Sequence, residues 1–273
     1  ISWADSLEGD VAAEVEKGKK QFKGTEISGK TLGIIGIGAI GAKVANAAHA
    51  LGMNVVGNSV VVSPLLTAPC KMYDSIPEMV EECDYISIHV PSLPATKGMV
   101  NKELISHMKD GVVVLNYARP DLIVEEDVLE AVKSGKIRKY MTDLADENLI
   151  NVPGVIATPH LGASTTEAED NCAAMAVDEL MDYFENGTIR NSVNFPAVTV
   201  DAKEGTVKAC ILYKGCDDIS AAVKKAVGTD NVAGLTDGKK RTEYGYAIAL
   251  INEGVDTAPL EKIPGVLKVR VIG

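Results

Sequence analysis

The chain has 273 residues, of which 46% are hydrophobic and 24% are charged, and its net charge is −11. This composition is typical of a soluble globular protein. The acidic balance argues against non-specific binding to nucleic acid or to an acidic membrane surface. No apolar run approaches the roughly 18 residues of a membrane span, and we recognise no secretory leader, so we expect a cytoplasmic protein.

The cysteines also fit a cytoplasmic protein. The five cysteines are odd in number, are scattered along the chain and include no CxxC pair: Cys70, Cys83, Cys172, Cys210 and Cys216. We therefore expect reduced thiols, with neither a disulfide framework nor a metal site.

The first chemical signal is the stretch TLGIIGIGAIG at 31–41. Residues 1–30 are polar and helix-prone, and we expect them to form a helical approach and a turn. A buried strand then leads into Gly36-x-Gly38-x-x-Gly41, and a helix is predicted at 42–51. Strand, glycine turn and helix in this order are the context of a dinucleotide-binding fingerprint. The helix N-terminus would offer its free N–H groups and partial positive charge to phosphates.

The next predicted strand, 53–57, lacks the acid that usually binds the adenosine ribose. Asn58 and Ser59 stand at that point, and the next carboxylate is Asp74. No Lys or Arg stands there either, so a 2′-phosphate is not favoured. We expect NAD rather than NADP, bound more weakly than usual.

Strands then alternate with helices. Strands are predicted at 31–35, 53–57, 84–90, 111–115, 136–141 and 155–157, and helices at 42–51, 76–83, 101–109 and 125–133. This spacing predicts an α/β fold with a doubly wound, Rossmann-like parallel sheet. Ligands bind beyond the carboxyl ends of such strands, so His89, Asn116–Arg119, Asp143 and His160 are the candidates for chemistry.

Each candidate has two interpretations. The Arg119 guanidinium could bind a substrate carboxylate, or it could pair on the surface with Asp121 or Glu125. His160, in TPHLGAST, could carry a proton near neutral pH, or it could make a structural hydrogen bond. Three carboxylates follow the strand that ends at Met141: Asp143, Asp146 and Glu147. One of them could orient a histidine, or all three could form a solvated acidic loop.

Four segments carry a family resemblance: GKTLGIIGIGAIGAKVANAAHALGM, CDYISIHVPSLPATKGMVN, GVVVLNYARPDLI and ATPHLGASTTEAEDNCA. They resemble the D-isomer-specific 2-hydroxyacid dehydrogenases, and among these the members that oxidise D-3-phosphoglycerate to 3-phosphohydroxypyruvate in L-serine biosynthesis. The resemblance covers about residues 16–196.

The resemblance implies NAD as cofactor and a phosphorylated 2-hydroxy acid as substrate. It implies that Arg119 holds the substrate carboxylate, that His160 is the acid/base and that Glu147 pairs with it. Asp143 would contact the nicotinamide amide. The residues expected along the cofactor cleft are Gly36, Gly38, Ala39, Ile40, Gly41, Asn58, Ser59, His89, Val90, Pro91, Thr96, Tyr117, Ala118, Arg119, Asp143, His160 and Gly162.

The chain departs from the family pattern at four points. Ser59 replaces the ribose acid, and Pro120 replaces the glycine after the arginine. Asn148 sits at the spacing expected for the glutamate, with Glu147 one residue early. The family's substrate domain comes mostly from residues that would precede Ile1, so we expect this chain to bind dinucleotide but to turn over D-3-phosphoglycerate poorly.

The remaining chain divides into a helix, a linker and a second unit. A helix is predicted at 165–183, ended by Asn186-Gly187, with apolar positions that either return toward the absent domain or pack in a core. We expect a dinucleotide-binding domain at 1–190, a linker at 191–203 and a small domain at 204–273.

The small domain shows the order βαββαβ. Strands are predicted at 206–213, 232–236, 243–250 and 266–271, helices at 217–227 and 256–262, and a turn at 238–240. This pattern predicts a ferredoxin-like sheet with helices on one face, and it resembles the ACT regulatory domain. The loop 213–218 lacks the His and Asn that family members use for serine. We expect a homodimer or homotetramer joined through the sheet edge, with a weak or absent serine response, or a dimerisation domain without a ligand.

Two other functions stay open. The chain could be a non-catalytic dinucleotide-binding or scaffolding relative, which the absent ribose acid, Pro120 and the shifted glutamate favour. It could also be a dehydrogenase of another small D-2-hydroxy acid, since the segment that would determine substrate specificity is not in the chain.

Overall fold

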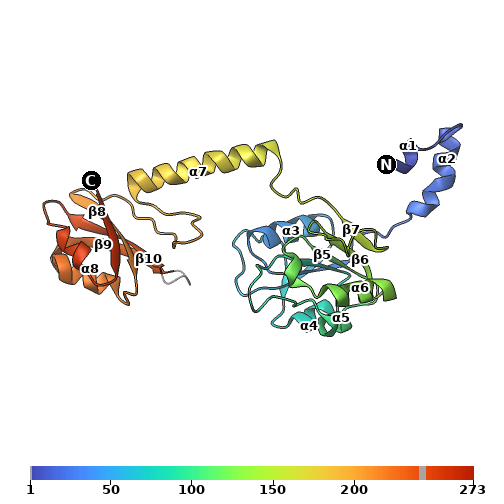
Figure 1. Cartoon of the computed structure of the whole chain (residues 1–273), viewed down its shortest axis with the longest axis horizontal. Coiled ribbons are helices and arrows are strands. Elements are labelled where there is room, and N and C mark those ends of the chain that lie inside the picture. The colour runs from blue at the N-terminus through green and yellow to red at the C-terminus, as the bar shows by residue number, and fades with distance from the viewer. Residues whose placement is uncertain (1, 240–243) are drawn as a thin grey trace. The chain divides into compact units, whose positions relative to one another are not determined.

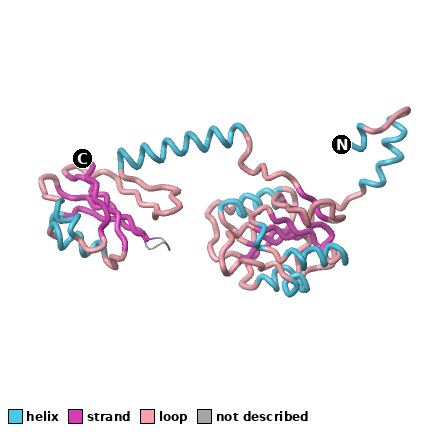
Figure 2. The backbone as a smooth tube through the Cα atoms, in the orientation of Figure 1, coloured by secondary structure: helices cyan, strands magenta, loops and turns pink. Residues whose placement is uncertain are grey.

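The computed structural model describes residues 2–239 and 244–273. The chain forms two compact units, one ending at Leu161 and the other comprising Gly162–Gly273. Figure 1 traces the elements in chain order, and Figure 2 separates helices from strands. The domain boundaries at 190 and 204 stay a prediction, and each unit is described here by itself.

The first unit is built on a seven-stranded parallel sheet of order β3-β2-β1-β4-β5-β6-β7. Its strands are β1 (Thr31–Ile35), β2 (Asn54–Asn58), β3 (Lys71–Met72), β4 (Tyr85–Ile88), β5 (Val112–Asn116), β6 (Ile137–Thr142) and β7 (Val155–Ala157). The predicted Rossmann-like parallel sheet is confirmed. The two-residue strand β3 is an addition to the prediction; it pairs with Val56 and Gly57 of β2.

Helices cover both faces of this sheet. They are α3 (Ala39–Ala50), α4 (Ile76–Val80), α5 (Lys102–His107) and α6 (Glu125–Ser134), with a 3-10 turn η2 (Pro120–Leu122). The alanines of α3 pack on one face, against β1 and β2. The apolar sides of α4, α5 and α6 pack on the other, as Figure 1 shows. Burial on both faces explains why the strands are continuous apolar runs.

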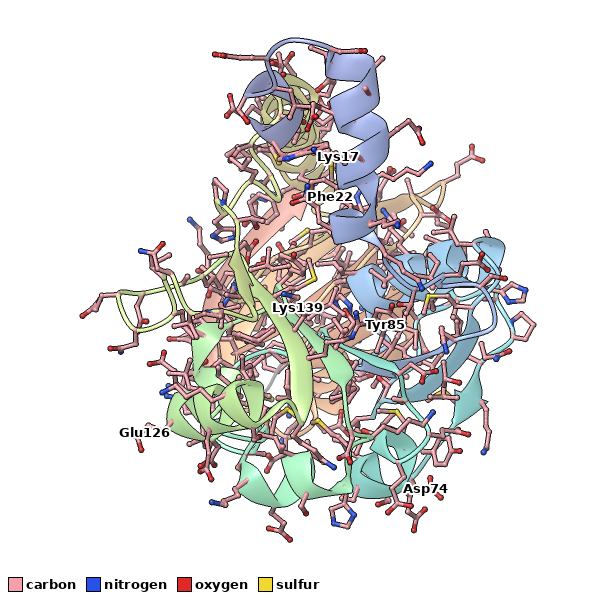
Figure 3. The ribbon with its side chains drawn as sticks, turned by 90° about the vertical axis from the view of Figure 1, so that its right-hand side faces the viewer. Lys17, Phe22, Asp74, Tyr85, Glu126 and Lys139 are labelled. Carbon is pink, nitrogen blue, oxygen red and sulfur yellow. The ribbon has the colours of Figure 1, made fainter. Side chains whose placement is uncertain are left out.

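A helical segment precedes the sheet, as expected. It comprises α1 (Ser2–Asp5), α2 (Val11–Gly18) and a 3-10 turn η1 (Lys19–Phe22). The Asp10 side chain caps α2 by accepting a hydrogen bond from the Ala13 N–H, and the rings of Trp3 and Phe22 lie 4.8 Å apart. Figure 3 labels Lys17 and Phe22 on this segment and Tyr85 and Lys139 on strands of the sheet.

The second unit contains a four-stranded antiparallel sheet of order β11-β8-β10-β9. Its elements are β8 (Thr206–Lys214), α8 (Ile219–Val227), η3 (Thr229–Asn231), β9 (Val232–Lys239), β10 (Tyr244–Asn252), η4 (Ala258–Lys262) and β11 (Val266–Ile272). The residues of α8 and η4 share one core with the sheet.

This unit follows the prediction in one short element and departs from it in another. The short helix predicted at 256–262 is present as the 3-10 helix η4, in which Pro259 lies in the first turn and removes an N–H donor. The predicted turn at 238–240 is wrong for its first two residues, because β9 runs through Gly238 to Lys239 in register with β10. Lys240 of that turn and Glu243 of the next predicted strand lie outside the described residues.

The long helix α7 (Thr166–Asn186) is placed as predicted and ends at Gly187, whose φ is +73°. None of its residues, all of which are described, is buried, so core packing of its apolar side is wrong. Met175, Val177 and Phe184 are more than half exposed.

The predicted linker packs on the second sheet. Ile189 and Val198 bond to each other through their backbones. With Phe195 and Val200 they cover the sheet face opposite α8, around Tyr246. The central strand β10 is therefore buried on both faces.

Candidate functional site

The candidate residues all follow strands of the parallel sheet. Because these strands share one direction, their carboxyl ends meet at a single edge of the sheet. Gly36 follows β1, Asn58 ends β2 and Ser59 follows it, His89 follows β4, Arg119 follows β5, Asp143 follows β6 and His160 follows β7. The topology thus gathers the predicted site at one edge.

The glycine turn leaves no room for side chains at two of its positions. Gly36 has φ +95°, a conformation that favours glycine. A Cβ on Gly36 would lie 2.8 Å from the His89 carbonyl oxygen, and a Cβ on Gly41 would lie 2.1 Å from the Gly36 carbonyl oxygen. Gly38 is different, because a Cβ there would meet no atom within 4 Å. The turn is closed toward the protein and open toward solvent.

The start of α3 fits a diphosphate. Gly38 is the N-cap residue and has no side chain to satisfy the first N–H groups of the helix. Gly38, Ala39 and Ile40 are all exposed, and the side chain of Ile40 is 69% exposed. Free N–H groups at the N-terminus of a twelve-residue helix form an anion site. NAD carries its phosphates on such a site.

The side chains of Asn58 and Ser59 are engaged within the protein. Asn58 Nδ2 donates to the carbonyl oxygens of Tyr73 at 2.9 Å and Asp74 at 3.3 Å. Ser59 Oγ accepts the Ile37 N–H at 3.0 Å and donates to the Val61 carbonyl at 2.7 Å. Their contact with a cofactor stays a prediction.

Hydrogen bonds within the segment at and after the end of β4 fix its conformation. His89 Nε2 lies 2.9 Å from Ser87 Oγ, and burial lowers the pKa of His89 from its usual 6.5. Val90 is half-buried against the sheet core. Thr96 Oγ1 donates to the Pro91 carbonyl at 2.6 Å and accepts the Leu93 N–H at 2.9 Å. These bonds hold the loop between β4 and α5 in shape.

The loop that carries Arg119 is held by Asn116, a fully buried residue at the end of β5. Asn116 Nδ2 donates to the Arg119 carbonyl at 2.9 Å and lies 3.3 Å from Tyr140 Oη, while its Oδ1 accepts the Ala118 N–H at 3.2 Å. Tyr117 is 39% exposed. Sequence reasoning placed Asn116 near the chemistry but missed this bracing role, for which its position at a strand end was the signal.

The Arg119 side chain is exposed and bonds to the Ala118 carbonyl through Nη1 at 2.6 Å. Within the described part of the chain it forms no ion pair. The two carboxylates expected to compete for it have other partners. Asp121 accepts from Ser92 Oγ at 2.6 Å and pairs with Lys97, and Glu125 accepts from Asn148. The guanidinium is therefore available for an external carboxylate.

The acidic segment after β6 holds one unsatisfied atom. Asp143 Oδ1 is buried without a hydrogen-bond partner among the described residues. A buried acceptor without a donor is costly, so an incoming N–H group, such as that of a nicotinamide amide, suits it. This orphaned oxygen and the open glycine turn are the two observations that fit NAD to the site.

Glu147 and Asn148 lie in the segment expected to supply the histidine's carboxylate partner. Glu147 is exposed, and Asn148, at the spacing expected for the family glutamate, donates to Glu125 Oε1 at 3.0 Å. Burial, and then the carboxylates of Asp146 and Glu147, raise the pKa of Glu125 despite that hydrogen bond. The role of Glu147 stays a prediction.

His160 follows β7 on an exposed loop. No hydrogen bond or ion pair of its ring occurs among residues 2–239 and 244–273. The structural hydrogen bond considered for it is therefore not made by the described residues. Gly162, two residues further along the chain, has open space where a Cβ would be. An exposed imidazole at this edge can exchange protons with a ligand.

The described residues also show what the site does not contain. They contain no group of three or more His, Cys, Asp or Glu side chains arranged to hold a metal ion. No helix among them is long and apolar enough to cross a membrane. All five cysteines are free thiols, and burial raises the pKa of Cys83 to about 12.

Comparisons with known proteins agree with this geometry. Residues 5–162 match the family model of the D-isomer specific 2-hydroxyacid dehydrogenase NAD-binding domain. The chain is 35% identical over 202 residues to a D-3-phosphoglycerate dehydrogenase of Methanocaldococcus jannaschii and 38% identical over 197 residues to that of Bacillus subtilis. These matches cover 71% and 68% of this chain but only 38% and 37% of those proteins.

Two further relatives extend the match. A D-3-phosphoglycerate dehydrogenase of Haemophilus influenzae is 31% identical over an alignment of 283 positions, gaps included, and the alignment covers 95% of this chain and 68% of that protein. Among solved structures, a glyoxylate reductase from Paecilomyes thermophila superposes with a TM-score of 0.58 at 30% identity. That superposition covers 67% of this chain and 58% of the reductase.

Proposed function

The chain belongs to the D-isomer specific 2-hydroxyacid dehydrogenase family, and from this premise we propose that it transfers hydride between NAD and C2 of a small D-2-hydroxy acid. The observation that carries the proposal is the shared sheet edge, where the glycine turn, Arg119, Asp143 and His160 follow strands of one direction. The NAD-binding domain of the family makes NAD the cofactor.

Each residue has a proposed part in holding the cofactor. The N–H groups of Gly38, Ala39 and Ile40 bind the diphosphate. Asp143 accepts a hydrogen bond from the nicotinamide amide. We propose that the other predicted cleft residues also lie along the bound cofactor: Asn58, Ser59, His89, Val90, Pro91, Thr96, Tyr117, Ala118 and Gly162. When bound, NAD⁺ supplies the acceptor for the hydride that leaves C2.

Two side chains act on the substrate, and a third orients one of them. Arg119 binds the carboxylate through its guanidinium fork and so orients C2. His160 takes the hydroxyl proton as the C2–H bond breaks and the carbonyl forms, and it returns that proton in the reverse direction. Glu147 orients the imidazolium that results. The reaction balances as hydroxy acid plus NAD⁺ to oxo acid plus NADH plus one proton.

The names of the relatives support a substrate. Three relatives that match this chain at 31–38% identity are D-3-phosphoglycerate dehydrogenases. We therefore propose D-3-phosphoglycerate, oxidised to 3-phosphohydroxypyruvate in serine biosynthesis, in the cytoplasm. Glyoxylate reductase and D-lactate dehydrogenase structures share the fold, so other small D-2-hydroxy acids are the next substrates to test.

For the second unit we propose an ACT-like regulatory domain of the ferredoxin type. Its element order and its strand order β11-β8-β10-β9 support this. The strands β9 and β11 are sheet edges that can pair with a second copy, so we propose a homodimer or homotetramer. The loop from Tyr213 to Asp218 carries neither His nor Asn, so we expect little response to serine.

The experiment is a fluorescence titration of the chain with NADH, followed by an assay of NADH oxidation with 3-phosphohydroxypyruvate, glyoxylate and pyruvate. We expect saturable NADH binding and the fastest turnover with the phosphorylated oxo acid. Binding without turnover of any oxo acid would favour a non-catalytic relative, a role that the absent ribose acid, the Pro120 substitution and the shifted glutamate support. Absence of NADH binding would refute both.

A further inference from the structure

We propose that Ser59 is a positioning residue that braces the glycine turn, and that the chain recognises the adenosine half of its cofactor without charge. As a consequence it binds NADH and NADPH with similar affinity. This inference rests on the proposed dinucleotide site and deepens it.

The first observation is a set of hydrogen bonds between the segment after β2 and the glycine turn. The Gly36 N–H donates to the Asn58 carbonyl at 2.8 Å, and the Ser63 N–H donates to the Ile37 carbonyl at 2.8 Å. Between them, Ser59 Oγ accepts the Ile37 N–H at 3.0 Å. Two backbone bonds and one hydroxyl thus join the two segments.

The Ser59 hydroxyl uses its donor as well, since it bonds to the Val61 carbonyl at 2.7 Å. A hydroxyl has one proton to donate, so Ser59 has no proton left for a ribose oxygen. It can only accept there, through its remaining lone pair. Its geometry is that of a clamp on the backbone, in the place where an acid would bind both ribose hydroxyls.

The second observation is the absence of charge. From Asn54 to Cys70 the chain carries no Asp, Glu, Lys or Arg. The glycine turn carries no charged side chain either, because the first charged residue after Thr31 is Lys43 on α3. Beyond Cys70, Lys71 pairs with Glu82 at 3.4 Å, and Asp74 follows. The backbone of Asp74 lies close to Asn58, whose Nδ2 donates to the Asp74 carbonyl oxygen at 3.3 Å. Within the segment 54–70 itself, a 2′-phosphate next to Ser59 would meet neither a carboxylate to repel it nor a cation to hold it.

The third observation is an apolar surface on the same segment. Val60, Val61 and Val62 are 101%, 74% and 44% exposed. Consecutive exposed valines are unusual on a surface that does not bind something apolar. Beside a diphosphate site, they offer a contact surface to a flat base such as adenine. Affinity for the adenosine half would then come from apolar contact and shape, which NADH and NADPH share.

The test compares the two nucleotides by fluorescence titration. We expect the Kd values of NADH and NADPH to lie within about tenfold of each other. Ser59→Asp supplies the absent carboxylate and should lower the affinity for NADPH by at least about tenfold relative to NADH. A Kd for NADH about a hundredfold lower than that for NADPH in the unaltered chain would overturn the proposal.

Further variants test whether Ser59 holds the glycine turn in place. Ser59→Ala should weaken binding of both nucleotides by the same factor, of about fivefold to tenfold for one lost hydrogen bond, and Ser59→Thr should restore it. Ser63→Ala is the matched control, because the Ser63 hydroxyl accepts the Leu65 N–H and not a group of the turn. Equal Kd values for the Ala variant and the unaltered chain would contradict the role of Ser59.

A readout without nucleotide separates the two proposals. Amide hydrogen exchange at Ile37 should be faster in Ser59→Ala than in the unaltered chain or in Ser63→Ala. If neither NADH nor NADPH binds the unaltered chain, the proposed function fails. If both bind but with very different Kd values, or if exchange at Ile37 is unchanged, this inference fails and the proposed function stands.

Discussion

The central strands of the two sheets are both well buried, yet the strand directions of the sheets give them different chemistry. In the parallel sheet, seven strands end at one edge, and polar residues from distant parts of the sequence follow those ends. In the antiparallel sheet, neighbouring strands run in opposite directions. Its strand ends alternate between two edges, so none of the candidate site residues comes from it.

The comparison shows what strand direction contributes beyond burial. The central strand β10 is buried along most of its length, as are β1 and β4 of the parallel sheet. Burial alone therefore distinguishes the two sheets poorly. Parallel direction is what places a helix N-terminus, a guanidinium and an imidazole at a common edge.

The largest expected effect is at the glycine turn of the parallel sheet. Gly41→Ala forces a Cβ to within 2.1 Å of the Gly36 carbonyl oxygen. We expect a loss of about 3 kcal/mol in the free energy of unfolding and loss of NADH binding. Gly38→Ala is the control, since it meets no atom within 4 Å. It should change stability by less than about 1 kcal/mol and still weaken NADH binding. Urea unfolding measures the stability of the two variants, and NADH titration measures their affinity. If Gly38→Ala bound NADH as tightly as the unaltered chain, the diphosphate site would be contradicted.

The next effect concerns the chemistry at this edge. His160→Ala should lower the turnover of the best oxo acid by about 10² to 10⁴, with the Kd of NADH unchanged. His107→Ala is the matched control, because His107 lies on α5 and pairs with Glu81 at 3.2 Å. Equal turnover in the two variants would assign His160 no part in proton transfer.

The antiparallel sheet should respond in stability alone. Gly245 pairs with Tyr213 across β10 and β8, and a Cβ there would lie 2.1 Å from the Tyr213 ring. Gly245→Ala should therefore destabilise this unit by about 1–3 kcal/mol while NADH binding stays the same. In Gly234→Ala the nearest atom is 3.5 Å away, so little should change. Thermal unfolding and NADH titration would reveal any effect on the site.

The smallest effect is a pH dependence at the end of β4. Burial lowers the pKa of His89 in the folded state below its unfolded value of 6.5, so protonation favours the unfolded chain. This contribution to stability is complete above pH 6.5 and is lost as the pH falls below it through the folded pKa. Unfolding midpoints at about pH 7.5 and about pH 5.5 should differ less for His89→Gln than for the unaltered chain. If the midpoint changed by the same amount between the two pH values in both proteins, His89 would make no contribution to the pH dependence of stability.

The parallel sheet could be predicted closely because local patterns determine it. Each strand buried on both faces is a short apolar run, and the glycine turn marks its own position. The helix after that turn begins at Ala39 rather than Ala42 because Gly38 serves as its N-cap. Strand β3 escaped prediction, since two residues paired with β2 leave no periodic signal.

The site was less predictable where partners are distant in sequence. The bond between Ile37 and Ser59 spans 22 residues, and no local pattern reports it. The exposed apolar side of α7 has the same sequence signature as a buried one, so core packing was a natural but wrong expectation. The extension of β9 through Gly238 follows from its register with β10, which composition does not reveal.

The buried amide of Asn116 has a consequence for the energetics of substrate capture. Since it bonds to the backbone of Ala118 and Arg119 and to the Tyr140 hydroxyl, the segment ahead of Pro120 is preorganised before any ligand arrives. A carboxylate that binds the Arg119 guanidinium does not have to order the loop that carries it, so the entropic cost of association is smaller.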